Sequence, residues 1–75
     1  MAKLPAIRGE RVVRALERAG FQRRRQRGSH VSLAKAGIRR PVVVPIHNQD
    51  LPRGTLAGIL KSAGLTLEAF LELLD

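Results

Sequence analysis

The sequence predicts a small α+β domain in which helices cover one face of a three-stranded antiparallel sheet. The chain has 75 residues, enough for one small domain with a single core. Apolar residues recur at helical spacing near both ends of the chain, whereas the middle third alternates as strands do. We therefore expect residues 1–75 to form one domain, with residues 1–7 as a loose lead-in.

The first predicted element is an amphipathic helix over residues 9–19. Val12 and Leu16 fall on one face of such a helix, and basic side chains fall on another. Glu10 stands four residues before Arg14, which is the favourable orientation for an ion pair along a helix.

Three strands are expected next, over residues 21–27, 30–34 and 40–46. The first strand has no apolar face beyond Phe21, so we expect it to be solvated or to lie at a sheet edge. Unbroken alternation would place Arg23, Arg25 and Arg27 on the same face of that strand. Residues 28–29 interrupt the pattern, and residues 35–39 are expected to form the next turn.

Two helices are predicted in the last third of the chain, over residues 55–63 and 67–74. Gly64 is expected to end the first of them, and Thr66 to cap the start of the second. Gly58 lies inside the first, where glycine costs about 1 kcal/mol relative to alanine, so we interpret it as a position of close packing. Asp50 is expected to cap the same helix. With all helices on one side, the opposite sheet face should stay open.

The chain is strongly basic, with 14 Lys and Arg against six Asp and Glu and a formal net charge of +8. Residues 1–40 hold twelve of the basic residues and two of the acidic ones. Such a field attracts polyanions, and arginine suits forked contacts with phosphate. An RNA or an acidic protein is the expected partner. The sequence has no cysteine and no apolar run of membrane-spanning length, so we expect a cytoplasmic protein without a membrane partner.

The two histidines are the leading candidates for chemistry, because the sequence has no Tyr, Trp or Cys. An imidazole can both accept and donate a proton near neutral pH. Val31 and Leu33 should face the core, so His30 is expected on the open face of the sheet. Alternation in the third strand places His47 on the same face.

The surroundings of His30 suit cleavage of an RNA backbone. Gly28 would let a ligand approach closely, and Ser29 offers a hydroxyl that can orient His30 or a phosphate. In this hypothesis His30 is the general base or acid for the ribose 2′-OH, and His47 is the second proton-transfer group. No metal or cofactor is needed, because arginines stabilise the phosphoryl charge. The candidate phosphate contacts are Arg23, Arg24, Arg25 and Arg27.

Three other interpretations stay open. A non-catalytic RNA-binding module would share the same fold and charge. A metal site at His47 and Asp50 is conceivable, but their spacing matches no ligand motif. The two C-terminal helices would resemble a helix-turn-helix, yet the second carries Glu68 and Glu72 without a basic residue, and phosphates would repel it.

Several short segments, each a weak signal alone, together form a pattern specific enough to indicate a protein family. They are residues 16–21, 25–30, 44–47, 54–56, 59–60 and 63–65, followed by Phe70. By these segments the chain resembles the HicA (YcfA-like) toxin family of bacterial type II toxin–antitoxin systems, over nearly its whole length.

The resemblance implies an α-β-β-β-α fold like that of a double-stranded-RNA-binding domain, with a short extra C-terminal helix. It also implies an endoribonuclease that cleaves mRNA and inhibits translation and growth, with His30 as the essential histidine. The implied protein partner is a HicB-type antitoxin that covers the active surface. From the basic charge of the chain, we expect that antitoxin to be acidic and to cover His30.

Overall fold

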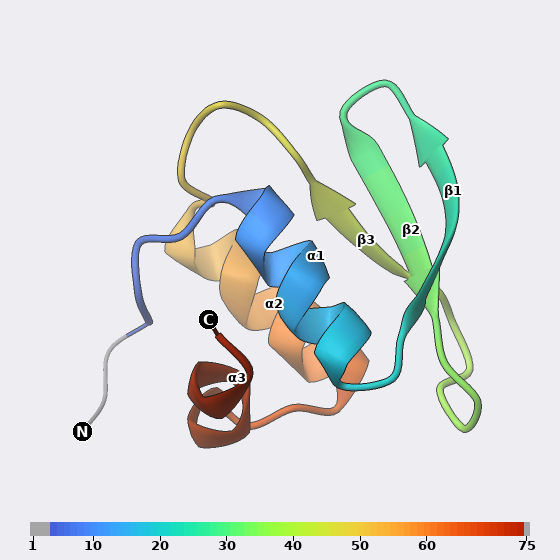
Figure 1. Cartoon of the computed structure of the whole chain (residues 1–75). Helices are drawn as coiled ribbons and strands as arrows, with labels where there is room; N and C mark the ends of the chain where they lie inside the picture. Colours follow the sequence, from blue (N-terminus) through green and yellow to red (C-terminus); the bar gives the residue numbers. More distant parts are fainter. Residues whose placement is uncertain (1–3, 75) are drawn as a thin grey trace.

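The computed structural model describes residues 4–74 and shows an α+β domain with three helices and one three-stranded antiparallel sheet (Figure 1). The elements are, in order, α1 (Gly9–Arg18), β1 (Gln22–Arg27), β2 (His30–Ala34), β3 (Val42–Pro45), α2 (Arg53–Ala63) and α3 (Leu67–Leu73). The predicted fold class is therefore confirmed, including its likeness to a double-stranded-RNA-binding domain. Residues 1–3 of the predicted lead-in lie outside the described residues.

The sheet has the strand order β1-β2-β3, so both β1 and β3 are edge strands. Helices α1 and α2 pack against the same face of the sheet, and α3 packs against α1 (Figure 1). One hydrophobic core lies between these layers. Its largest fully buried side chains are Phe70, Ile7, Leu16, Leu33, Leu56, Val12, Val13, Val31, Val42 and Val44.

Alternating burial decides which sheet face is open. In β2, Val31 and Leu33 are buried, whereas His30 at the strand start is exposed. In β3, Val43 keeps 46% of its surface exposed between two buried valines. Cross-strand partners share a face, so the pairing of Ser32 with Val43 continues the same open surface. The predicted faces of β2 and β3 are confirmed.

The N-terminal segment is anchored from Ile7 onward, so the prediction of a loose lead-in is wrong for that residue. Ile7 is 2% exposed, and its carbonyl accepts a hydrogen bond of 2.8 Å from the backbone N–H of Leu51. Arg8 and Asp50 then form an isolated β-bridge. These contacts join the start of α1 to the segment before α2. Burial of the Ile7 side chain in the core stabilises this arrangement, because it removes apolar surface from water.

The predicted helix end at Gly64 and the predicted cap at Thr66 are confirmed, but the predicted cap at Asp50 is wrong. Gly64 ends α2 in the left-handed conformation at φ +71°, and the hydroxyl of Thr66 accepts a hydrogen bond of 3.1 Å from the N–H of Ala69 at the start of α3. Helix α2 instead begins after Pro52 without a side-chain cap. Asp50 is therefore not its capping residue, since the isolated β-bridge to Arg8 uses the backbone of Asp50 two residues earlier.

The two helical glycines Gly9 and Gly58 have opposite environments. A Cβ built on Gly9 would overlap the backbone carbonyl oxygen of Pro45, so α1 approaches the end of β3 as closely as a backbone allows. A Cβ on Gly58 would meet nothing within 4 Å. The interpretation of Gly58 as a close-packing position is wrong, because its side of α2 faces solvent.

These environments predict opposite effects for the same substitution. Gly9→Ala should lower the free energy of unfolding by about 1–3 kcal/mol, the usual cost of overpacking. Gly58→Ala should raise it by about 1 kcal/mol, because alanine favours a helix and the site has room. Urea denaturation followed by circular dichroism measures both. A Gly9→Ala variant as stable as the wild type would contradict the close contact between α1 and β3.

Candidate functional site

The two histidines lie side by side at the end of the sheet where β2 begins and β3 ends. Their ring centroids are 6.1 Å apart, and the ring planes meet edge-on at 88°. His30 pairs across the sheet with Pro45, and His47 follows two residues after that proline. Both imidazoles are exposed. Two side chains that can each accept or donate a proton therefore face the same small region of solvent.

A tight turn between β1 and β2 positions His30. Arg27 pairs with His30, so Gly28 and Ser29 form a two-residue hairpin loop. Gly28 adopts φ +56°, a left-handed conformation that glycine reaches without strain, and glycine at the first loop position is typical of a type II′ turn. A Cβ there would meet nothing within 4 Å. The turn alone accounts for this glycine, and the open space beside it is compatible with the predicted ligand access.

The same turn is tied to the segment that carries His47. The carbonyl of Ser29 accepts a hydrogen bond of 2.6 Å from the backbone N–H of Ile46. The side chain of Gln26 donates a further hydrogen bond of 3.1 Å to the carbonyl of Gly28. The hairpin loop and the end of β3 are thus joined through main-chain atoms, which holds the two histidines in register.

A cleft with a volume of about 310 Å³ opens beside the histidine pair. Its walls come from the end of the sheet, the connection to α2 and the first turn of α2. The polar lining residues are His30, His47, Gln49, Asp50 and Thr55. The sequence patterns did not predict Gln49 or Thr55 as site residues. The one feature that could have indicated Thr55 is its place in residues 54–56, one of the segments that resemble HicA toxins. Among residues 4–74, no three His, Asp or Glu side chains cluster as ligands for a metal ion.

The arginines of β1 are divided between the two sheet faces by a β-bulge. Arg23 pairs with Leu33 and Arg25 pairs with Ser32, so Arg24 is an extra residue in the strand. Since cross-strand partners share a face, Arg23 points to the helix side and Arg25 to the open side. The prediction that unbroken alternation keeps these two arginines on one face is wrong, because a bulge re-aims the side chains that follow it.

Beyond the bulge, the arginines flank the histidine. Arg27 is the direct cross-strand partner of His30, and Arg25 lies two residues further along the same open face. Arg24 lines a separate shallow pocket with Lys35 near the opposite end of the strand. Every residue of β1 is exposed, as predicted for a polar edge strand. Of the four candidate phosphate contacts, Arg25 and Arg27 are therefore the two on the histidine face near His30.

Arg23 is engaged with α1 instead. Its Nη2 lies 3.3 Å from Oε1 of Glu10, and its Nε lies 3.4 Å from Oε2 of Glu17. This double contact joins the first strand to the first helix across the covered side of the sheet. Glu10 thus pairs with Arg23 and not with Arg14, because Arg23 lies on the sheet face that α1 covers.

A comparison with protein families finds that residues 9–65 match the family described as the HicA toxin of bacterial toxin–antitoxin systems. The matched segment includes both histidines, the hairpin loop and the whole sheet. A comparison with curated proteins finds no match. Within residues 4–74, no helix is long and apolar enough to cross a membrane. Because the match spans most of its length, the chain belongs to the HicA toxin family.

Proposed function

We propose that this HicA-family toxin is an endoribonuclease, an mRNA interferase that works in the cytoplasm and inhibits translation. The observation that carries the proposal is the pair of exposed imidazoles, with ring centroids 6.1 Å apart, beside two arginines on the same sheet face. Proton transfer and phosphate binding are the two requirements of RNA backbone cleavage by the 2′-OH. The geometry brings groups for both together.

In the proposed reaction, His30 removes the proton from a ribose 2′-OH, and O2′ attacks the adjacent phosphorus. The bond from phosphorus to O5′ breaks as His47 donates a proton to the departing oxygen. The products are a 2′,3′-cyclic phosphate and a 5′-hydroxyl. His30 begins neutral and ends protonated, whereas His47 begins protonated and ends neutral. A later proton exchange with water restores both histidines to their starting states.

The arginines on the histidine face supply charge. Arg27 beside His30, and Arg25 beside Ser32, can hold the non-bridging oxygens of the phosphate under attack. Their guanidinium groups then stabilise the charge that develops on those oxygens in the transition state. Gly28 and Ser29 support the site by forming the turn, and Arg23 contributes through its contact with α1.

Membership in a toxin–antitoxin family implies an antitoxin as the protein partner. We propose that this partner is a HicB-type protein with an acidic surface that covers His30. The formal net charge of +8 favours such a surface, and a bound acidic protein would exclude RNA from the same arginines.

The first of three predictions from this proposal concerns His30. His30→Ala should reduce RNA cleavage by about 10²–10⁴-fold, the usual contribution of a proton-transferring residue, while RNA affinity stays close to that of the wild type. The assay follows a long single-stranded RNA in EDTA and identifies the 2′,3′-cyclic phosphate ends. Circular dichroism confirms that the variant is folded.

Equal cleavage by the wild type and the His30→Ala variant would rule out His30 as the catalytic residue. Binding that depends strongly on salt, without cleavage by either protein, would favour the alternative of a non-catalytic RNA-binding module. That alternative also predicts that His30→Ala changes affinity only slightly.

The second prediction separates the roles of the two histidines. His47→Ala should slow cleavage of an ordinary phosphodiester, because the departing O5′ loses its proton donor. A substrate with a 4-nitrophenolate leaving group needs no such donor, so the His47→Ala variant should cleave it nearly as fast as the wild type does. His30→Ala should slow both substrates. A His47→Ala variant that slows both equally would contradict its role as the acid.

The third prediction compares two arginines of one strand. Arg25→Ala should weaken RNA binding and reduce the slope of log affinity against log salt by about 0.7, as expected for one lost phosphate contact on a single strand. Arg23→Ala should leave that slope unchanged and cost at most about 1 kcal/mol of stability, as an exposed ion pair does. Equal slopes for the two variants would show that the bulge does not select the RNA-binding arginines.

A further inference from the structure

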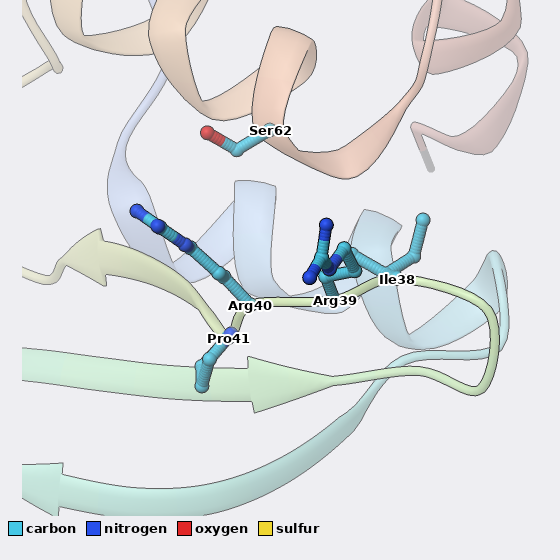
Figure 2. A pocket seen from close by; sticks show the side chains of 5 residues that line it. All are labelled: Ile38, Arg39, Arg40, Pro41 and Ser62. Carbon is cyan, nitrogen blue, oxygen red and sulfur yellow. The ribbon is translucent and has the colours of Figure 1, made fainter.

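A second cavity lies at the other end of β3, away from the histidines. It has a volume of about 650 Å³ and is lined by Ile38, Arg39, Arg40, Pro41 and Ser62 (Figure 2). Four of these residues belong to the connection between β2 and β3, and Ser62 lies in the last turn of α2. Figure 2 shows both arginine side chains on the α2 side of that connection, with the Ser62 side chain above them.

Both guanidinium groups at this cavity lack a counter-charge. Arg39 and Arg40 are exposed, and no ion pair or hydrogen bond engages either side chain within residues 4–74. The sequence has no Asp or Glu between Glu17 and Asp50. Two forked cations and a hydroxyl therefore face one cavity without a protein acceptor, which is a donor set that suits a phosphate.

The cavity and the histidine cleft lie near opposite ends of the same strand and helix, β3 and α2. The cavity is lined by Pro41, which precedes β3, and by Ser62 near the end of α2. The histidine cleft is lined by Pro45 at the end of β3 and by Thr55 near the start of α2. Helix α2 packs against β3 and runs in the opposite direction (Figure 1), so the two sites lie at opposite ends of this strand and helix. Six residue steps separate Pro41 from His47, about 20 Å of extended chain at about 3.3 Å per residue.

We infer that the cavity at Arg39, Arg40 and Ser62 is a second phosphate-binding site, which holds the RNA backbone several nucleotides from the cleaved bond. This inference rests on the proposed RNA substrate but not on catalysis. A single strand that runs along β3 and α2 would place one phosphate at the histidines and another between the two guanidinium groups. Binding energy gained at the remote phosphate would then anchor the strand at the reacting bond.

An RNA is favoured over an acidic protein as the occupant of this cavity. The two guanidinium groups of the cavity are planar, forked donors, which match the oxygens of a phosphate. The cavity also lies at the other end of β3 and α2 from the histidine cleft, which binds a phosphate in the proposed reaction. One RNA strand can therefore place a phosphate in each site.

The test uses an RNA of about 12 nucleotides, within the site sizes of single-strand binders, with every ribose 2′-O-methylated so that it cannot be cleaved. We expect Arg39→Ala/Arg40→Ala to weaken its binding about tenfold and to lower the salt slope by about 0.7–1.4, which corresponds to one or two phosphates. Fluorescence anisotropy at several salt concentrations measures both quantities.

The matched control is Arg14→Ala, which removes one exposed arginine from α1. It should leave the salt slope unchanged, whereas Arg39→Ala and Arg40→Ala alone should each lower it. A cleavable dinucleotide is too short to reach the second site, so the double variant should cleave it at the wild-type rate. Slower cleavage of the dinucleotide would contradict the inference, because it would mean that the two arginines act on the histidine site.

Each remaining result supports or overturns the inference. The double variant removes two charges and Arg14→Ala removes one. If each lost charge lowers RNA affinity equally in the two proteins, the inference is overturned, because a diffuse positive field then explains the binding. Unchanged RNA affinity with weaker binding to the antitoxin would also overturn it and assign the cavity to an acidic protein. A wild type that binds the methylated RNA through Arg39 and Arg40, yet cleaves no RNA, would support the second site while contradicting the proposed catalysis.

Discussion

Helices α1 and α2 pack on one face of the sheet, and this packing governs where the side chains of the site lie. Val31 and Leu33 in β2, with Val42 and Val44 in β3, are buried beneath these helices. A strand alternates strictly, so burial of these positions forces the positions between them to the other face. A register slip of one residue would bury His30 and expose its apolar neighbours, at a cost of several buried side chains.

Two local irregularities turn this regular sheet into a functional surface. The loop at Gly28 ends β1 and starts β2, and the hydrogen bond from Ile46 to Ser29 joins that loop to the end of β3. The bulge at Arg24 then changes which arginines share the face of His30. The bulge interrupts the regular ladder of hydrogen bonds. Both features occur where the proposed chemistry needs side chains aimed at one phosphate.

The distribution of charge follows from the same architecture. The cations of β1 and of the connection between β2 and β3 repel one another, and a small domain has little stability with which to offset that repulsion. Ion pairs of Arg23 with Glu10 and Glu17 offset part of this repulsion, and these are the two acidic residues of α1. Among residues 4–74, the arginines on the open face and at the start of β3 have no such partner, and a polyanion is the natural counter-charge for them.

Sequence patterns predict the order of the elements, the buried strand positions and the exposure of His30, because each depends on periodicity or on capping within a few residues. They do not predict the closeness of His30 to His47, the bulge that separates Arg23 from Arg25, or the tight contact at Gly9. These features depend on how segments distant in the chain pack together. Pairing register and interhelical approach are set by the whole core, and no local pattern encodes them.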